Sequence, residues 1–323
     1  MTYIQNRPAT STDESCIDIK KFIDYLKGDR EHSEAISVPS AFSDSIMSKI
    51  RVLSPIKSLA RITHTSGDRL DVVIESEDVN NCGWVTNDAL GDEKKNNISK
   101  VSIHLHQLFA KPRVTQSLLD DHSARVEEFL NDKITSQMAA SENSSFLFGN
   151  GINQPKGILT YDISTEGPKA KHIEAEVGGE PGKITGYEVL VNLMEKLPSK
   201  YLAGASWVMS RNAASYIRSM KDPSTNKFLW QNSIAYGVPD TLLGYPVVIC
   251  DDMPKIATNE KQCVPVLFAN LYEGYQIAEK PCINILKDPY NAKPFVEFYA
   301  TKRVGGDVVN FDAIKALVLK KNG

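Results

Sequence analysis

The feature that most constrains this chain is a glycine-rich stretch, FLFGNGINQPKGIL, at residues 146–159, directly after a long amphipathic segment. Gly149 and Gly151 stand where a helix should end, because glycine takes the left-handed φ of a C-cap without steric cost. Pro155 cannot continue a helix, and Gly157 permits a further turn. No Lys-Ser/Thr pair follows, so a phosphate-binding loop is disfavoured and an ordered structural junction is favoured.

The amphipathic segment before this stretch predicts one long helix over residues 117–143. Apolar residues recur there at spacings that place them on one helix face: Val126, Phe129, Leu130, Ile134 and Met138. At about 1.5 Å per residue such a helix would be roughly 35–40 Å long. The glycine-rich stretch would then be the point where this helix stops.

Residues 61–110 change to a period of two, which predicts strands. Leu70, Val72 and Ile74 alternate with polar neighbours, and the same pattern returns around Val101 and Ile103. A mixed-charge connection separates the two strands. An isolated two-stranded hairpin is marginally stable in water, so this arm is expected to need a partner surface.

Two histidines, His104 and His106, alternate on the second of these strands. They would point to the same face, where a metal ion is one possible ligand. No carboxylate or thiol that would complete the site stands nearby in sequence. Two partly exposed polar positions on a strand are the favoured interpretation.

The ends of the chain carry weaker signals. Residues 17–26 predict a short amphipathic helix that either docks on a neighbouring subunit or caps the chain locally, and residues 162–183 form a polar Gly/Pro-containing boundary. Beyond it the pattern alternates, which suggests an α/β or α+β layer. Expected helices are 185–197 and 211–220; expected strands are 206–209, 242–250, 264–269, 276–286 and 295–303, with 313–319 a strand or a helix.

Composition excludes several classes of protein. The 323 residues are 41% hydrophobic with a net charge of −3, which argues against a protein that generally coats nucleic acid. No apolar run reaches the ~20 residues of a membrane span, and no signal-peptide core begins the chain. The five scattered cysteines predict reduced thiols of a cytoplasmic protein and neither a disulfide framework nor a zinc site. No cofactor is expected. The sequence has no HExxH, GxSxG or Walker motif, which disfavours an enzyme.

The glycine-rich stretch resembles the hallmark of tailed-phage major capsid proteins with the HK97 fold, which reads close to FLxGdGxxqPxGIL. Further segments resemble that family in the expected order, and the last of them is most similar to capsids of alphaproteobacterial gene transfer agents and related prophages. These segments are Ser54-Pro55-Ile56, Gly83-Trp84-Val85, Leu118–Asp121, Trp207–Ser210, Met220-Lys221-Asp222, Phe228-Leu229-Trp230, Leu243–Val247, Asp252-Met253-Pro254, Lys287-Asp288-Pro289 and Phe298–Asp307.

The resemblance implies an α+β, HK97-like capsid fold with several named parts. They are an N-terminal arm (1–50), a first peripheral part (51–180) with an extended β-hairpin loop (64–106) and a spine helix (117–143), an axial α/β domain (181–274), peripheral return strands (275–303), and a C-terminal segment (304–323) returning to the axial domain. Gly149, Gly151, Pro155 and Gly157 would then form a structural hinge after the spine helix.

The function implied is a structural one without catalysis. The subunit would assemble with itself, as hexamers and pentamers, into an icosahedral-type shell around double-stranded DNA. Portal and scaffolding or protease proteins would be further partners, with no membrane; assembly would occur in the bacterial cytoplasm and the product would be a virion or particle. An encapsulin-like compartment around protein cargo is the alternative.

The family also suggests roles for individual residues. Trp84, Lys94, Lys95 and Lys100 would make extended-loop contacts, and Asp222, Phe228 and Trp230 would lie in an axial-domain loop. Lys20, Lys21, Arg125 and Lys133 are candidate cations near the DNA, with solvated helix faces as the alternative interpretation.

Two departures from the family pattern carry predictions. Few residues precede Ser40, so a scaffolding region is expected to be separate or already removed. The founding member crosslinks a loop lysine to an asparagine of a neighbour, but the matching place here is Lys293-Pro294, with Asn291 close but not aligned. No covalent crosslinking is therefore expected.

Overall fold

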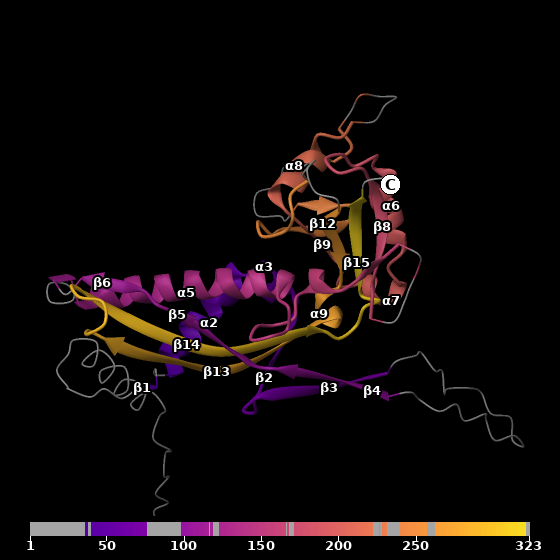
Figure 1. The fold of residues 1–323 in the computed structure, drawn as a ribbon. Helices are drawn as coiled ribbons and strands as arrows, with labels where there is room; N and C mark the ends of the chain where they lie inside the picture. The colour runs from indigo at the N-terminus through magenta and orange to yellow at the C-terminus, as the bar shows by residue number, and fades with distance from the viewer. Residues whose placement is uncertain are drawn as a thin grey trace, which may run out of the picture. The chain divides into compact units, whose positions relative to one another are not determined.

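The computed structural model describes most of the chain beyond residue 35 (Figure 1). The described residues are 36–37, 40–75, 98–115, 117–118, 123–165, 167, 171–221, 226, 228–230, 240–256 and 262–320. They divide into two compact units. The first contains the described residues within 1–54, 106–143 and 280–304, and the second contains those within 55–105, 144–279 and 305–323. The stretch expected to be the first peripheral part, 51–180, is thus shared between both units.

The first unit combines helices with a sheet of long antiparallel strands. The sheet order is β1-β13-β14-β5, with β6 also paired to β14. Ala300 lies opposite Ala110, and Phe295 opposite Thr115. The elements are α2 (Ser40–Leu53), α5 (Ser123–Phe148), β1 (Ile36–Ser37), β5 (His106–Ala110), β6 (Arg113–Thr115), β13 (Tyr275–Asp288) and β14 (Phe295–Val308), the last two and α5 continuing into the second unit.

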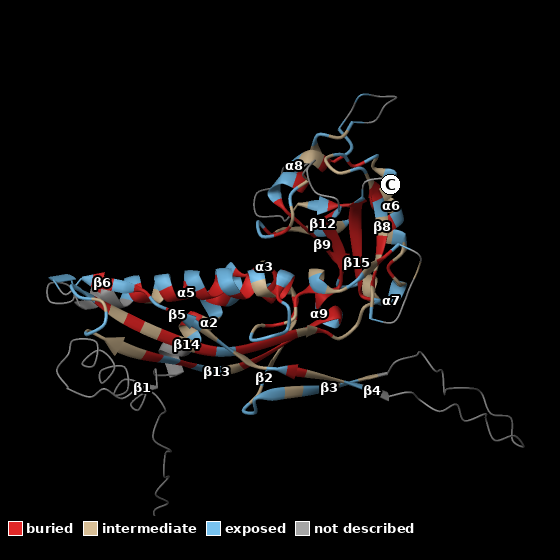
Figure 2. Ribbon diagram, viewed as in Figure 1, coloured by how far each residue is buried: buried red, intermediate tan, exposed pale blue. Residues whose placement is uncertain are grey.

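The core of the first unit contains residues from one face of α5 and alternate residues of β13 and β14. Figure 2 marks the buried positions along these elements. Leu130, Ile134 and Met138 are buried, as their helical spacing predicts. Phe129 is 39% exposed, so its assignment to the same stripe was wrong. The core includes buried side chains from α2, α5, β13 and β14: Ile46, Ile50, Leu130, Ile134, Met138, Ile283, Ile285, Val296 and Phe298.

Helix α5 ends later than the predicted residue 143. Phe146 and Leu147 are completely buried, so the helix continues by more than a turn to Phe148. The ring of Phe146 lies 5.8 Å from that of Tyr275, edge to face. Burial of these two side chains therefore extends the helix to the glycines.

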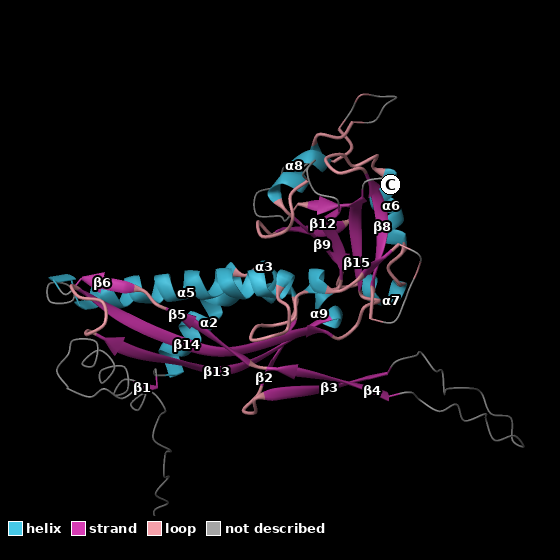
Figure 3. Cartoon of the chain, in the orientation of Figure 1, coloured by secondary structure: helices cyan, strands magenta, loops and turns pink. Residues whose placement is uncertain are grey.

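The second unit contains a mixed seven-stranded sheet in the order β10-β11-β9-β12-β15-β8-β7. Figure 3 labels four of its strands, β9, β12, β15 and β8. β9 and β11 are parallel, as are β8 and β15, whereas β12 is antiparallel to both β9 and β15. The unit combines helices with this mixed sheet, which is an α+β arrangement, as predicted. Its elements are α3 (Pro55–Leu59), η1 (Ile158–Thr160), β7 (Ile163–Ser164), β8 (Ile173–Gly179), α6 (Glu188–Glu195), α7 (Ser199–Leu202), β9 (Ser206–Met209), α8 (Arg211–Arg218), β10 (Thr241–Leu242), β11 (Tyr245–Ile249), β12 (Gln262–Ala269), α9 (Leu271–Gly274) and β15 (Ile314–Lys320).

The sheet shows that one strand prediction was wrong, and it shows that the last apolar stretch, predicted as a strand or a helix, is a strand. The stretch predicted as one strand, 242–250, is a tight hairpin, because Leu243 and Gly244 have φ of +53° and +86° and turn the chain back. The last apolar stretch is a strand, β15, in which every residue but Lys320 is buried. Trp207 and Phe268 stack at a centroid distance of 4.4 Å in the core of this sheet.

A separate two-stranded sheet also belongs to the second unit. β3 (Arg69–Glu75) pairs with β4 (Ile98–His104), with Leu70 opposite Ile103 and Val72 opposite Val101. The predicted alternation and hairpin are confirmed. The connection at 76–97 lies outside the described residues. β2 (Arg61–His64), just before the hairpin, runs parallel to the start of β13.

Candidate functional site: the glycine turn and the assembly surfaces

The glycine turn, residues 149–157, is closed by short backbone contacts. The amide of Gly149 donates to Ser145 O (2.9 Å), and that of Gly157 donates to Gly149 O (2.8 Å). A Cβ on Gly149 would lie 2.0 Å from Pro155 O, and one on Gly157 would lie 2.5 Å from Leu147 O. Both positions therefore require glycine because two backbone segments touch there.

This geometry corrects the reason given for Gly149. Gly151 has the predicted left-handed conformation, with φ +78°, but φ of Gly149 is not positive. The sequence pattern correctly predicted that Gly149 must be glycine. The predicted reason, a left-handed φ, was wrong. Close approach of Pro155 could not be read from local spacing.

A polar cluster, the Asp307 junction, fixes the glycine turn to neighbouring strands. It consists of Lys156, Tyr161, Tyr275 and Asp307. The amide of Lys156 donates to Gly306 O (2.9 Å), and the hydroxyl of Tyr275 donates to Lys156 O (2.8 Å). The hydroxyl of Tyr161 donates to the Asp307 carboxylate. Sequence reasoning gave Tyr161 and Asp307 no role, because they lie 146 positions apart.

Burial sets the protonation of the Asp307 junction. Desolvation raises the pKa of Asp307 above its usual value, against the hydrogen bonds from Tyr161 and the Val308 amide that lower it. Desolvation likewise raises the pKa values of Tyr161 and Tyr275, helped by the nearby Asp307 charge. Both phenols therefore stay neutral, and Asp307 is the group that titrates.

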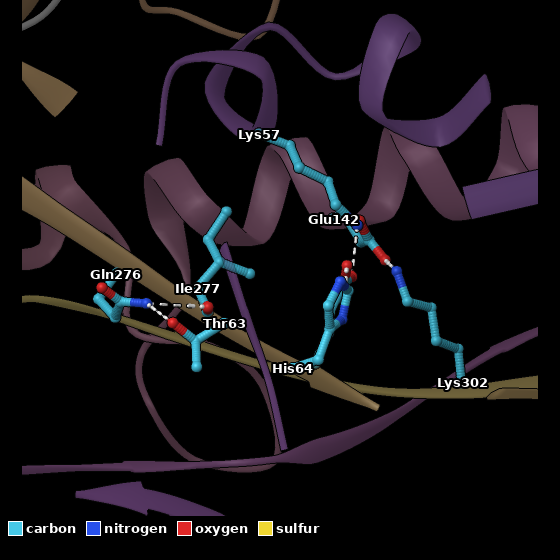
Figure 4. A network of polar contacts seen from close by, with 8 residues as sticks. Lys57, Thr63, His64, Glu142, Gln276, Ile277 and Lys302 are labelled. Atoms are coloured by element: carbon cyan, nitrogen blue, oxygen red, sulfur yellow. Dashed lines mark hydrogen bonds and ion pairs between the residues drawn. The ribbon is translucent and has the colours of Figure 1, made fainter. Parts of the chain in front are cut away.

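Buried lysine–glutamate pairs recur in both units. In the first, Lys302 Nζ lies 2.6 Å from Glu142 Oε1, and both side chains are fully buried (Figure 4). In the second, Lys57 Nζ lies 2.7 Å from Glu279 Oε2, and Lys315 Nζ lies 2.6 Å from Glu174 Oε2. Each ion pair compensates two charges that would be costly to bury alone, so a structural role accounts for all three.

The β3–β4 hairpin presents an apolar face that the subunit covers only in part. Among its facing apolar residues only Ile103 is buried, while Leu70, Val72 and Val101 are half-buried. The other face is mixed, because it carries the exposed Val73 beside an ion pair. In that pair Lys100 Nζ lies 2.9 Å from Asp71, and this hydrogen bond is the main cause of the lowered pKa of Asp71. The apolar face is a candidate contact for another copy.

Several predicted site residues cannot be placed. Trp84, Lys94, Lys95, Asp222, Lys20 and Lys21 lie outside the described residues. Arg125 belongs to α5, but its side chain also lies outside them. Their assigned roles remain predictions.

The remaining predicted residues fall in different surroundings. Phe228 is 55% exposed, whereas Trp230 is buried, with the Arg218 guanidinium 4.7 Å above its ring. Lys133 is exposed and lies 5.7 Å from the Phe129 ring. Lys133 belongs to the first unit, and Phe228 and Trp230 belong to the second.

Metal-holding side-chain groups and membrane-spanning helices are both absent from the described part of the chain. No group of three His, Cys, Asp or Glu side chains there has a geometry that could hold a metal ion, including the surroundings of His104. No described helix is long and apolar enough to cross a membrane.

Comparison with known proteins decides the family. Residues 34–319 match the model of the phage capsid family. The chain belongs to the phage capsid family. Its fold also matches the solved capsid of a native gene transfer agent (GTA) particle, with 36% identity, a TM-score of 0.72, and 83% of this chain and 90% of that chain covered. These matches confirm the predicted HK97-like capsid fold. They also confirm the predicted function, that of a major capsid protein.

Two more distant relatives show how far the similarity in sequence and in fold extends. The major capsid protein of Escherichia phage T5 is 22% identical over 282 residues, which cover 83% of this chain and 58% of the T5 protein. This chain thus spans somewhat more than half of that relative. The SrpI encapsulin of Synechococcus elongatus matches with a TM-score of 0.55, covering 84% of this chain and 88% of that chain, but at 13% identity, which indicates a shared fold alone.

Proposed function

We propose that this chain is the repeating subunit of a closed shell, built from pentamers and hexamers, that encloses double-stranded DNA. The observation that carries the proposal is the 35–36% identity to GTA capsids over 83% of the chain. The subunit would act without catalysis. Portal and scaffolding or protease proteins would join it during assembly in the bacterial cytoplasm, and the product would be a virion or virion-like particle.

Exposed apolar side chains support a protein that completes its surface with other copies. Among the described residues Val52 and Ile152 are 82% and 71% exposed. Obligate interfaces commonly exceed ~2,000 Å², so such side chains and the apolar hairpin face would be covered in the shell. A shell closes only if the repeated contact between different surfaces has a matching rotation and curvature.

Contact with DNA would be weak and independent of sequence. Lys20, Lys21, Arg125 and Lys133 remain the proposed cations. Around Lys133 the exposed residues of α5 include Glu128 and Asp132, so attraction to phosphate would be partly offset there. A wall of this kind would confine DNA without condensing it.

The extended loop and the axial loop would supply the contacts between copies. Trp84, Lys94 and Lys95 would act at the loop tip, and Asp222 with Phe228 would act in the axial region. Gly149, Gly151, Pro155 and Gly157 would keep the end of the spine helix in a fixed conformation. No covalent crosslink is proposed.

Electron microscopy with a nucleic-acid assay tests the proposal. Particles purified from cells that carry the complete gene cluster are treated with nuclease, imaged by negative stain and assayed for DNA. Closed shells with protected DNA are expected. Shells with protein cargo and no DNA would favour a compartment instead, and a soluble monomer with no particles would refute shell formation.

A further inference from the structure

A polar pocket lies on the sheet of the first unit, on the face opposite the core. Its volume is about 370 Å³, a size typical of pockets that hold small molecules. Residues of three neighbouring strands, β5, β13 and β14, line it. None of the residues predicted from the sequence to form a site belongs to this lining.

Strand alternation explains why polar side chains gather on this face. Ile283 and Ile285 of β13 belong to the core that α5 completes, so Cys282 and Asn284 point to the opposite face. The same alternation on β14 leaves Arg303 exposed between two buried neighbours. The pocket therefore opens on the side of the sheet that α5 does not cover.

The lining consists of cations and neutral hydrogen-bond donors. Lys280 and Arg303 bring two positive charges, and Gln107, Asn284 and Thr301 bring neutral groups that can donate. Gln107 lies directly opposite Arg303 in the β5–β14 pair, so these two side chains are neighbours. No described residue of the lining is a carboxylate. Such a lining favours an anion with several acceptor oxygens.

A third lysine of the lining, Lys302, is already neutralised. Its Nζ lies 2.6 Å from Glu142 Oε1, and both side chains are fully buried. The charge that the lining presents therefore comes from Lys280 and Arg303. An ammonium and a guanidinium group together match one doubly charged oxyanion, whose oxygens they bind through charge-assisted hydrogen bonds.

We propose that this pocket binds a free, doubly charged oxyanion of the phosphate class. Lys280 and Arg303 would neutralise the anion, and Gln107, Asn284 and Thr301 would orient its oxygens. A nucleic-acid backbone is the less well supported source of the phosphate, because α5, which carries proposed DNA-facing cations, packs on the opposite face of the sheet. The pocket is independent of shell formation, so its failure would leave the proposed function untouched.

Protection of Cys282 from a thiol reagent measures occupancy of the pocket. Cys282 lines the pocket and is exposed, whereas Cys250 and Cys263 are buried. Cys16 and Cys82, which lie outside the described residues, are replaced by serine in the full-length chain. The rate of modification by the neutral reagent N-ethylmaleimide is followed by mass spectrometry, in rising inorganic phosphate and in sodium chloride of the same ionic strength.

Phosphate is expected to slow the modification of Cys282 in a saturable way. The rate should fall about tenfold once phosphate reaches ten times its dissociation constant. Sodium chloride should not protect. Equal rates in phosphate and chloride would overturn the proposal, and so would a thiol that does not react even without phosphate, because another copy would then cover the pocket. Protection by a short DNA duplex at far lower phosphate-group concentration would overturn it in favour of nucleic acid.

Arg303→Gln removes one of the two cations that the proposal requires. The phosphate concentration for half-protection should rise about fivefold, the effect of one unit charge ~4 Å away in water. Each protein is compared with itself without phosphate, so a change in thiol reactivity cancels. The matched control is Lys111→Gln, which removes a cation beside Glu297, outside the lining, and should keep the wild-type protection. An unchanged concentration in Arg303→Gln would overturn the proposal.

A second variant, Asn284→Asp, keeps the test valid if Arg303→Gln does not fold. Asn284 is exposed, so a carboxylate of nearly the same shape should be tolerated there. Its negative charge would repel an anion in the pocket, and protection by phosphate should be lost. Protection equal to that of the wild type would contradict an oxyanion site.

Discussion

The seven-stranded sheet and the β3–β4 hairpin differ in how far their apolar residues are buried within the subunit. The sheet ends on both sides in two-residue strands, β7 and β10, and its central strands β12 and β15 are almost entirely buried. Short edge strands limit unwanted pairing with other chains. Within the described residues, the two hairpin strands form a sheet only with each other, and most of their apolar face is half-buried.

This difference in burial suggests that the sheet stabilises the subunit, whereas the apolar hairpin face serves assembly of the shell. A sheet that covers its own core contributes to folding before any neighbour arrives. A two-stranded hairpin is marginal alone and gains most of its stabilisation from a partner surface. Substitutions in the sheet and at the turn should therefore affect folding, and those on the apolar hairpin face should affect assembly.

The largest effect is expected for Gly149→Val at the glycine turn. Its Cβ would lie 2.0 Å from Pro155 O, which backbone atoms cannot accommodate without breaking the turn. We expect no soluble folded subunit, measured by yield and circular dichroism. Gly151→Ala is the milder comparison, because its cost is left-handed φ, about 1 kcal/mol. Normal shells from Gly149→Val would disprove the close-approach account.

The next largest effect is expected for Lys315→Met within the seven-stranded sheet. Lys315 lies beside Glu174 across the β15–β8 pair, and removing the ammonium leaves a mostly buried carboxylate without that partner. We expect unfolding to become easier by about 3 kcal/mol in chemical denaturation. The double variant Lys315→Met/Glu174→Met should recover most of the loss; no recovery would contradict a charge-based cause.

A smaller change in stability, with a large change in assembly, is expected for Val72→Asp on the hairpin. The side chain is already half-buried, so the free energy of unfolding of the subunit should change by less than about 1 kcal/mol. Shells should not form. Val73→Asp on the opposite, 66% exposed position is the control and should still assemble. Loss of folding in Val72→Asp would remove the distinction between the two regions.

The smallest effect concerns covalent chemistry on the hairpin. Lys100 bonds to Asp71 of its own subunit, and Lys100→Met should leave the electrophoretic pattern unchanged. On a denaturing gel, particles should dissociate into a single band near 35.8 kDa. A ladder of covalent oligomers would show that crosslinking occurs after all.

Local patterns predicted the elements that depend on local physics. Alternation identified β3 and β4, and helical spacing identified the buried side of α5. The hairpin inside 242–250 was missed because an apolar run hides a turn at Leu243, which is not a usual turn residue. The end of α5 was missed because tertiary burial of Phe146 extends the helix.

Interactions between distant residues were beyond the reach of the sequence. Glu142 and Lys302 are 160 positions apart, and neither looks different from a solvated surface charge in the sequence. The same holds for Tyr161 and Asp307. Motif resemblance supplied the family and its expected surfaces, whereas the polar contacts that fix the glycine turn required coordinates.

Assembly of the subunit in cells that carry the complete gene cluster tests the central claim most directly. Its mass distribution is measured by mass photometry and its particles are imaged by negative-stain microscopy, with Val72→Asp alongside. The account predicts closed shells for the wild type and folded, unassembled subunits for the variant. Shells that form equally well from both proteins would contradict it, as would a wild type that yields only monomers from these cells.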